Sequence, residues 1–210
     1  MAVSDEIIVT GGKDTKVRVW LTADALCHSV HPCRHFHEFG EAQMEITQVL
    51  ISPISNQRVY AGSLDKTCRV YDVPSKCLLK QIQTASAILL MRVDLPETYL
   101  YLACDNLNIY QVPIKEPNQK KTLTHRKRVT ALTLSTDGTR LISGDAQGLI
   151  YIWLLSSEDI PLKTFELHKD KGAVTNLVAV ERPLSLFGLT ANMSAYDPSS
   201  IKPLQRQVTP

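Results

Sequence analysis

His125 and Ser143 are residues of the types that act as general base and nucleophile in hydrolases, where a carboxylate completes the set. Gln147 stands where the similar stretches of the chain carry Asp14 and Asp65, and the sequence contains no G-x-S-x-G nucleophile elbow. Trp153 points to a different arrangement, because a buried histidine, hydroxyl and indole N–H can satisfy one another's hydrogen bonds. The pattern therefore favours a structural polar network over a catalytic site.

Two other stretches carry residues of the same types. Thr10, Asp14 and Trp20 repeat the hydroxyl, acid and indole, and their histidine would lie upstream of Met1. Asp65 and Tyr71 repeat the six-residue step from Asp14 to Trp20. We therefore expect a structural network within each repeat, made by His125, Ser143, Trp153, Thr10, Asp14, Trp20, Asp65 and Tyr71.

A tract rich in cysteine and histidine lies between these stretches. Thiolate and imidazole are the ligands that zinc prefers, and the tract offers Cys27, His28, His31, Cys33, His35 and His37. The spacing forms no C-x-x-C pair and none of the usual closed zinc patterns. A long connecting loop is the favoured interpretation, and no metal or cofactor is predicted.

The basic segment of the chain consists of Lys120, Lys121, Arg126, Lys127 and Arg128, preceded by Lys115. A cluster of cations on one loop could contact RNA phosphates or an acidic partner. The alternative is ordinary solvated charge, since the net charge of the chain is only +2. No aromatic residue is interleaved, so nothing favours stacking on single-stranded bases.

The elements that would position these residues form a repeat. The pattern of residues 62–73 predicts a tight turn followed by a strand. The same pattern recurs at residues 11–20, 104–110, 143–153 and 192–197. The aromatic that closes each copy is Trp20, Tyr71, Tyr110, Trp153 or Tyr196. The steps between these aromatics are 51, 39, 43 and 43 residues. A period of roughly 40–45 residues ending in an aromatic strand is typical of WD repeats, with four strands to each propeller blade.

The sequence therefore predicts an all-β fold, an incomplete WD-repeat β-propeller with four to five blades out of an expected seven. The expected blades span residues 1–37 (partial), 38–84, 85–122, 123–168 and 169–210. The first blade is expected to lack its opening strand, because Ile7 begins what reads as a second strand. Residues 113–122 are expected to form a polar loop, and residues 173–180 the first strand of the last blade. A closed ring of five blades is the alternative.

Composition bounds the class of protein further. Five cysteines without a small-domain spacing favour reduced thiols in a cytosolic or nuclear protein. No stretch approaches the roughly 18 apolar residues of a membrane span, and residues 1–6 do not resemble a signal peptide. There is no P-loop, no G-x-G-x-x-G and no paired carboxylates in a recognisable frame. No class of enzyme is predicted.

Several phrases resemble a more specific family, the WD-repeat subunit of the rixosome, a nucleolar complex that processes pre-ribosomal RNA. The resemblance covers residues 11–176 and rests on residues 63–67, 71–73, 86–88, 93–95, 108–112, 125–126, 129–130, 134–138 and 171–176. It implies a non-catalytic scaffold that supports removal of the second internal spacer and maturation of the large ribosomal subunit. Some members are also linked to replication licensing on chromatin.

The resemblance also implies partners. Family members associate with subunits of helical-repeat type on the pre-ribosomal particle, in the nucleus, nucleolus or nucleoplasm. The first blades and the C-terminal helical extension through which members dimerise have no counterpart in these residues, so the oligomeric state stays open. The alternative function is a WD-repeat adaptor of another kind, such as a ubiquitin-ligase substrate receptor or a trafficking module.

Overall fold

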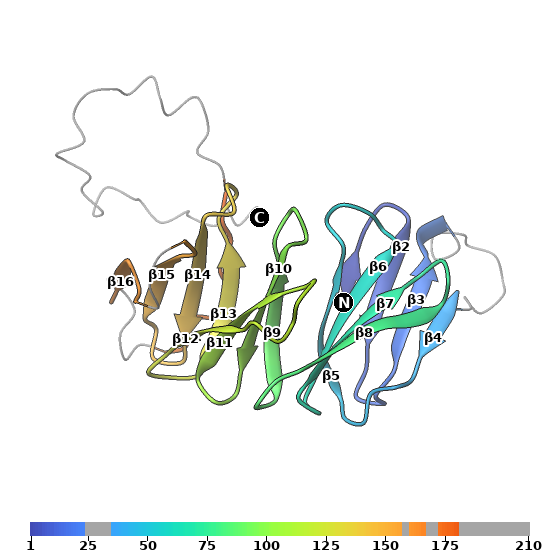
Figure 1. Cartoon of the computed structure of the whole chain (residues 1–210), viewed down its shortest axis with the longest axis horizontal. Coiled ribbons are helices and arrows are strands. Elements are labelled where there is room, and N and C mark those ends of the chain that lie inside the picture. Colours follow the sequence, from blue (N-terminus) through green and yellow to red (C-terminus); the bar gives the residue numbers. More distant parts are fainter. Residues whose placement is uncertain (24–34, 157–159, 167–171, 181–210) are drawn as a thin grey trace, which may run out of the picture. The chain divides into compact units, whose positions relative to one another are not determined.

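The computed structural model describes residues 1–23, 35–156, 160–166 and 172–180 of the chain (Figure 1). All the strands lie in one compact unit, Met1–Ala179. These described residues form four antiparallel sheets of four strands each, which confirms the predicted all-β fold class and a partial propeller. Within the described residues, no helix has the length and apolar character needed to cross a bilayer.

Each sheet is built from four strands that follow one another in the chain. The first contains β1 (Ala2–Val3), β2 (Ile7–Gly11), β3 (Val17–Leu21) and β4 (His37–Phe39). The second contains β5 (Ile46–Ile51), β6 (Arg58–Ser63), β7 (Thr67–Asp72) and β8 (Cys77–Gln83). The third contains β9 (Ile88–Val93), β10 (Tyr99–Cys104), β11 (Asn108–Pro113) and β12 (Lys121–Thr124). The fourth contains β13 (Val129–Leu134), β14 (Arg140–Asp145), β15 (Ile150–Leu154) and β16 (Lys163–Phe165).

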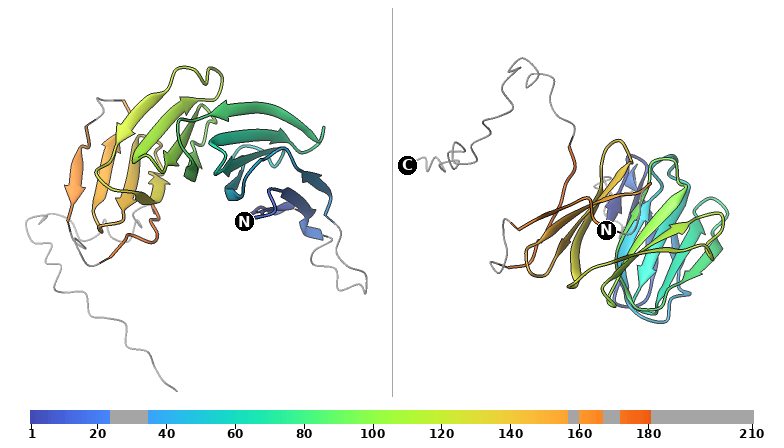
Figure 2. Two further views of the ribbon diagram at one scale, coloured as in Figure 1. Left: turned by 90° about the horizontal axis from the view of Figure 1, so that it is seen from below. Right: turned by 60° about the vertical axis from the view of Figure 1, so that its left-hand side comes forward.

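Successive sheets pack face to face in chain order, as Figure 2 shows. The opening strand β5 contacts β2 and β9, and β9 contacts β13. Three apolar clusters fill the layers between the sheets, and they include Tyr71, Leu100 and Trp153 respectively. Because each strand alternates its side chains between two faces, both faces of a middle sheet can be buried in this way.

The central hairpin of each sheet has the same register. A small residue pairs across the hairpin with the residue six positions later: Gly11 with Val17, Gly62 with Cys68, Ala103 with Ile109, and Gly144 with Ile150. A side chain would not fit at the glycines. A Cβ on Gly62 would lie 2.6 Å from Met91 Sδ, and one on Gly144 would lie 2.6 Å from Val174 Cβ. The small residues therefore allow the next segment of chain to approach the hairpin closely.

This register corrects one prediction about the third repeat. Nine residues after the small residue, the first, second and fourth sheets carry Trp20, Tyr71 and Trp153. The third sheet carries Val112 at that position, paired with Leu100, and not Tyr110. The third hairpin therefore has the same length as the others, and the step is 41 residues on either side of Val112. Tyr110 instead accepts a hydrogen bond from Asn106 Nδ2 at 2.9 Å.

Two further expectations about strands were wrong. The first sheet does have an opening strand, β1, because Ser4 closes a tight turn in which its hydroxyl donates to the Ile7 carbonyl at 3.1 Å. The expected polar loop at residues 113–122 ends early, since β12 starts at Lys121 and pairs there with Gln111.

Residues 173–180 do not form a strand, although Val174 lies against the fourth sheet as a strand residue would. The Val174 amide donates to the Asp145 carbonyl at 3.1 Å, and the Thr130 hydroxyl donates to the Val174 carbonyl at 2.6 Å. The second sheet holds the next strand in the same manner, through the Thr47 hydroxyl and the Ile88 carbonyl at 2.8 Å. Without hydrogen-bonded strand neighbours among the described residues, the segment has no ladder.

Candidate functional site

The three network residues expected in the fourth sheet are joined by direct hydrogen bonds. The indole N–H of Trp153 donates to Ser143 Oγ at 2.7 Å, and that oxygen lies 2.8 Å from His125 Nε2. Strands β14 and β15 supply the serine and the tryptophan, and His125 follows β12 at the turn into the fourth sheet. Because Ser143 accepts from Trp153, its own proton is available to donate to His125 Nε2.

The network is sealed inside the protein. Ser143 is 0%, Trp153 2% and His125 3% exposed, and Tyr151 packs its ring edge against His125 at 4.6 Å between centroids. Burial lowers the pKa of His125 to about 4, with the charge of Asp145 opposing the shift. The imidazole is therefore neutral at pH 7, and a serine at this depth cannot reach a substrate unless the sheet opens. The geometry favours a structural role for the set.

The acid of this region is Asp145, a residue that sequence reasoning left out of the network. It is fully buried, and its Oδ1 accepts from the amides of Gln147 and Leu149, both at 2.9 Å. Tyr151 donates to its Oδ2 at 3.4 Å. The repeat gave no signal for Asp145, because Gln147 is the residue that corresponds in register to Asp65. His125 Nδ1 is buried and has no hydrogen-bond partner among the described residues.

In the first sheet the structure joins only part of the expected set. Trp20 Nε1 donates to the Thr10 hydroxyl at 3.0 Å, and the ring of His35 packs edge-on against Trp20 at 5.8 Å between centroids. Asp14 does not join them. Its carboxylate pairs with Arg18 at 2.6 Å in the exposed turn, and the hydrogen bond from Arg18 holds the pKa of Asp14 below its ordinary value against the opposing effect of burial.

In the second sheet the two expected residues, Asp65 and Tyr71, have different structural roles. Asp65 accepts hydrogen bonds from the Gln43 amide and from Arg69 Nη1, both at 2.9 Å, so it ties the turn to the preceding loop. Burial alone raises the pKa of Asp65, but these bonds and those from Thr67 outweigh it and leave the pKa lowered. Tyr71 stacks on Phe39 with ring centroids 4.2 Å apart.

Most of the cysteine and histidine tract falls outside the described residues, including Cys27, His28, His31 and Cys33. Of the two described members, His35 packs against Trp20 and His37 packs its ring against Phe39. Across the described ranges, no three His, Cys, Asp or Glu side chains are grouped to hold a metal ion.

The five members of the basic segment lie on two elements. Lys120 directly precedes β12 and Lys121 is its first residue, whereas Arg126, Lys127 and Arg128 lie in the turn between β12 and β13. Lys120 donates to the Gln83 carbonyl, and Arg128 lies 3.5 Å from Asp105. Arg126 and Lys127 are exposed and have no acidic partner within the part of the chain that the structure describes.

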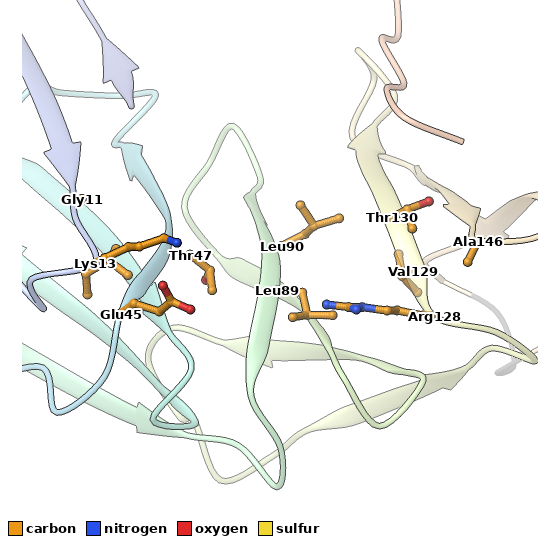
Figure 3. A pocket seen from close by; sticks show the side chains of 11 residues that line it. Gly11, Lys13, Glu45, Thr47, Leu89, Leu90, Arg128, Val129, Thr130 and Ala146 are labelled. Carbon is orange, nitrogen blue, oxygen red and sulfur yellow. The ribbon is translucent and has the colours of Figure 1, made fainter. Parts of the chain in front are cut away.

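Arg128 also borders a cavity of about 600 Å³ between the inner strands of the sheets. Figure 3 shows Lys13 and Glu45 on one side of this space and Arg128 on the other, with Leu89 and Leu90 of β9 between them. The charged lining among the described residues is thus two cations and one anion.

Comparison with known proteins supports the repeat assignment. The family model "WD domain, G-beta repeat" matches residues 33–72 and 117–153. WD repeat-containing protein 18 of Bos taurus is 29% identical over 197 residues, which cover 85% of this chain and 44% of that protein. Pre-rRNA-processing protein IPI3 of Yarrowia lipolytica is 26% identical over 182 residues, which cover 76% of this chain and 42% of that protein.

A third relative carries a different name. Protein ROOT INITIATION DEFECTIVE 3 of Arabidopsis thaliana is 27% identical over 159 residues, which cover 71% of this chain and 36% of that protein. The chain therefore spans less than half the length of each of these curated relatives. Similarity over most of the chain relates it to WD repeat-containing protein 18 and IPI3.

Proposed function

Because the chain is a WD40-repeat protein related to WD repeat-containing protein 18 and pre-rRNA-processing protein IPI3, we propose that it is a non-catalytic scaffold subunit of a nuclear ribosome-biogenesis complex. The observation that carries the proposal is the similarity to IPI3, whose name states a role in pre-rRNA processing. The buried state of His125 and Ser143 supports the non-catalytic part, since neither side chain is open to a substrate.

In this role the chain supports spacer removal and large-subunit maturation by holding other proteins together. Its partners are subunits of helical-repeat type on the pre-ribosomal particle, and it acts in the nucleus, nucleolus or nucleoplasm. Stacked sheets with buried cores suit this task, because the turns at their ends are held by a rigid framework. Turns such as the one at Asp65, which is hydrogen-bonded to Gln43 and Arg69, offer fixed surfaces for protein contacts.

Contact with rRNA is a second part of the proposal, and Arg126 and Lys127 carry it. Both are exposed on one turn and have no acidic partner among the described residues. Lys120 and Arg128 are partly engaged within the chain, through Gln83 and Asp105. Neutralising phosphates with two arginine or lysine side chains adds affinity without choosing a base sequence.

Co-purification from cells tests the scaffold role. The tagged chain should recover pre-ribosomal RNA that retains the second internal spacer, together with helical-repeat subunits of the processing complex. Lowering the amount of the protein should make spacer-containing precursors accumulate. Recovery of cullin adaptors or coat subunits without pre-ribosomal RNA would instead support the alternative function of a ubiquitin-ligase receptor or trafficking module.

A salt series tests the RNA contact. Arg126→Gln with Lys127→Gln should weaken binding to pre-ribosomal RNA, and the slope of log affinity against log salt should fall by up to about two. Lys120→Gln is the matched control, because Lys120 is bound to the Gln83 carbonyl and should change the slope less. An unchanged slope in the double variant would assign Arg126 and Lys127 to ordinary solvated surface.

A further inference from the structure

Val174 lies against the fourth sheet in the way that the first residue of β5 lies against the first sheet. The Val174 amide donates to the Asp145 carbonyl at 3.1 Å, and the Ile46 amide donates to the Gly12 carbonyl at the same distance. Asp145 and Gly12 are equivalent in register, because each follows the small residue of its hairpin. The segment that starts at Val174 therefore takes the place of the opening strand of a further sheet.

The residue pattern of this segment is also that of an opening strand. In β5, β9 and β13 two buried apolar residues stand three positions apart, and the segment repeats that spacing with Val174 and Leu177. β5, β9 and β13 each pair with a hairpin strand, whereas residues 174–179 have no strand partner within the part of the chain that the structure describes. Val178 is 72% exposed. An unpaired backbone edge of this kind is a template for another strand.

The first sheet has the opposite deficiency. Its opening strand β1 pairs with β2 over two residues only, and the pairing ends where Ala2 meets Val9. Thr10 and Gly11, the next two residues of β2, have no partner in β1. In the second sheet the opening strand continues along the hairpin beyond the equivalent positions. The inner edge of β2 thus lacks most of an opening strand, while residues 174–179 form an opening strand that lacks a sheet.

The face of the first sheet that points away from the second sheet resembles a face that is buried elsewhere. Arg18 and Asp14 form an ion pair on it, with side chains that are 28% and 47% exposed. The equivalent pair of the second sheet, Arg69 and Asp65, is 4% and 5% exposed. Trp20 lies on the same face as Arg18 and is only partly buried. This open face of the first sheet therefore suits a neighbouring sheet of the same repeat.

The fourth sheet has an open face of the complementary kind. Ile142, Ile150 and Ile152 point away from the third sheet, because they alternate with residues such as Tyr151 that pack on it. All three isoleucines are partly exposed. The equivalent positions of the second sheet, on β6 and β7, are buried in the layer that faces the third sheet. The open face of the fourth sheet is thus apolar and suited to a following sheet.

These two open faces do not meet within one molecule. The first and fourth sheets are the two ends of the row of sheets (Figure 1). β5 contacts β2 and β9, and β9 contacts β13. Among the described residues, β13 makes no contact of similar extent with β1 or β2. The four sheets therefore do not close on themselves.

We propose that the open face of the first sheet stacks on the open face of the fourth sheet of a second copy of this chain. Residues 174–179 of that copy then replace β1 as the opening strand of the first sheet. In the register that β5 has on β6, Leu177 lies opposite Thr10 and Val178 lies opposite Val9. Made twice, the contact joins two sets of four sheets into a ring of eight, within the roughly four to eight blades of known propellers.

The proposal goes beyond the scaffold role and does not rest on it, because the test uses the purified chain alone. Sedimentation over a series of protein concentrations should show a monomer that is converted to a dimer. Hydrogen exchange on the same samples should show protection of the amides of residues 175–179 only where the dimer is present, since strand pairing engages them. A monomer at every concentration would overturn the proposal. Protection that does not depend on concentration would also overturn it, because the segment would then be covered within its own chain.

Two variants place a charge on one open face each. Ile152→Glu alters the fourth sheet, and Ile8→Glu alters the first sheet on the face that carries Trp20. Each variant alone should raise the dissociation constant of the dimer at least about tenfold, because both contacts of its dimer then bury a carboxylate. A mixture of the two variants can form a dimer in which one contact has no substitution. The mixture should therefore associate more tightly than either variant alone.

Leu79→Glu is the matched control. Leu79 is 51% exposed on β8 of the second sheet, so it lies on neither open face. It should leave the dimer unchanged, and circular dichroism should show that all three variants are folded. A dimer that persists in folded Ile152→Glu and Ile8→Glu proteins would overturn the proposal. A mixture that associates no better than the single variants would do so as well, because it would indicate a contact between identical faces. Hydrogen exchange of the unaltered chain decides the question if a variant does not fold.

Discussion

The third and fourth sheets have the same register but fill it with different chemistry. Where the fourth sheet has Ser143 and Trp153, the third has Leu102 and Val112. His125 lies in the turn that leads into the fourth sheet, and Thr84 lies at the equivalent position of the turn that leads into the third. Both sheets bury these positions almost completely.

The difference shows what the repeat requires. The hairpin register and the close approach of neighbouring sheets are common to both, so a polar network is not needed to form a blade. The stability of an apolar layer depends on how well its side chains fill the available volume. The stability of a polar layer also depends on every donor and acceptor having a partner. The fourth sheet should therefore be the more sensitive of the two to single substitutions and to pH.

The largest expected effect is from loss of the indole. Trp153→Ala removes the largest fully buried side chain of the chain's described part and leaves a cavity, which should lower the free energy of unfolding by about 3–5 kcal/mol. Val112→Ala, at the equivalent position of the third sheet, should cost about 1–3 kcal/mol. Chemical denaturation of both variants measures the difference. Equal losses would mean that the two layers do not differ in the way proposed.

Acid should destabilise the fourth sheet through His125. Burial holds the pKa of His125 at about 4 in the folded protein, below the unfolded value of about 6.5. The unfolded chain thus binds the proton more readily, so stability falls as the pH drops from about 6.5 to about 4, by up to about 3 kcal/mol, and this histidine contributes no further loss below that range.

The control for this pH dependence is taken from the third sheet. His125→Thr installs the residue type found at Thr84, which does not titrate in this range. Unfolding free energies of the two proteins should be measured from pH 7.5 to 4, and their difference should change across that range. If the two pH profiles are parallel, His125 is not buried in its neutral form.

Ser143→Ala should have an intermediate effect. It removes the one oxygen that meets both Trp153 Nε1 and His125 Nε2, so the expected loss is about 1–3 kcal/mol. Thr10→Val is the matched variant in the first sheet. It removes a single partner from Trp20, a side chain that is not fully buried and can turn to water. Thermal unfolding that shows the larger loss for Thr10→Val would contradict this account.

The repeat was predictable from the sequence because its signals are local. A tight turn, an alternating strand and a spacing near 40 residues identify the four-stranded sheets without knowledge of their packing. The same reasoning misplaced the third aromatic, because Tyr110 matches by residue type while Val112 matches by register. Strand pairing decides register, and a single sequence does not contain it.

The sites were less predictable because they combine distant residues. His125, Ser143 and Trp153 were recognisable as a set, since their types and order follow the repeat. Asp94 and Gln111, which both line a cavity of about 400 Å³ between the third and fourth sheets, follow no such pattern. They lie 17 residues apart on separate elements, and only the pairing of β10 with β9 and β11 brings them to one place.

The smallest effect is expected in the tight turn of the central hairpin, which all four sheets share. The fourth residue after the small one has positive φ in all four hairpins, at Thr15 (68°), Lys66 (68°), Leu107 (66°) and Gly148 (86°). Only the fourth sheet has glycine there, and a left-handed conformation costs a residue with a side chain roughly 1–2 kcal/mol. Replacing such a residue by glycine removes this cost. Glycine loses more backbone freedom on folding than other residues do, however, and that loss offsets part of the gain.

Lys66→Gly should therefore stabilise the protein by about 0.5–1 kcal/mol. Lys66 is the clean choice because it is exposed, whereas Leu107 is partly buried and would also lose packing. The reverse change, Gly148→Ala, should destabilise by about 1 kcal/mol, and the two together should be nearly additive because they lie in different sheets. Urea unfolding of the two single variants and the double variant measures all three values. Destabilisation by Lys66→Gly would show that the lysine side chain contributes more to this turn than its backbone conformation costs.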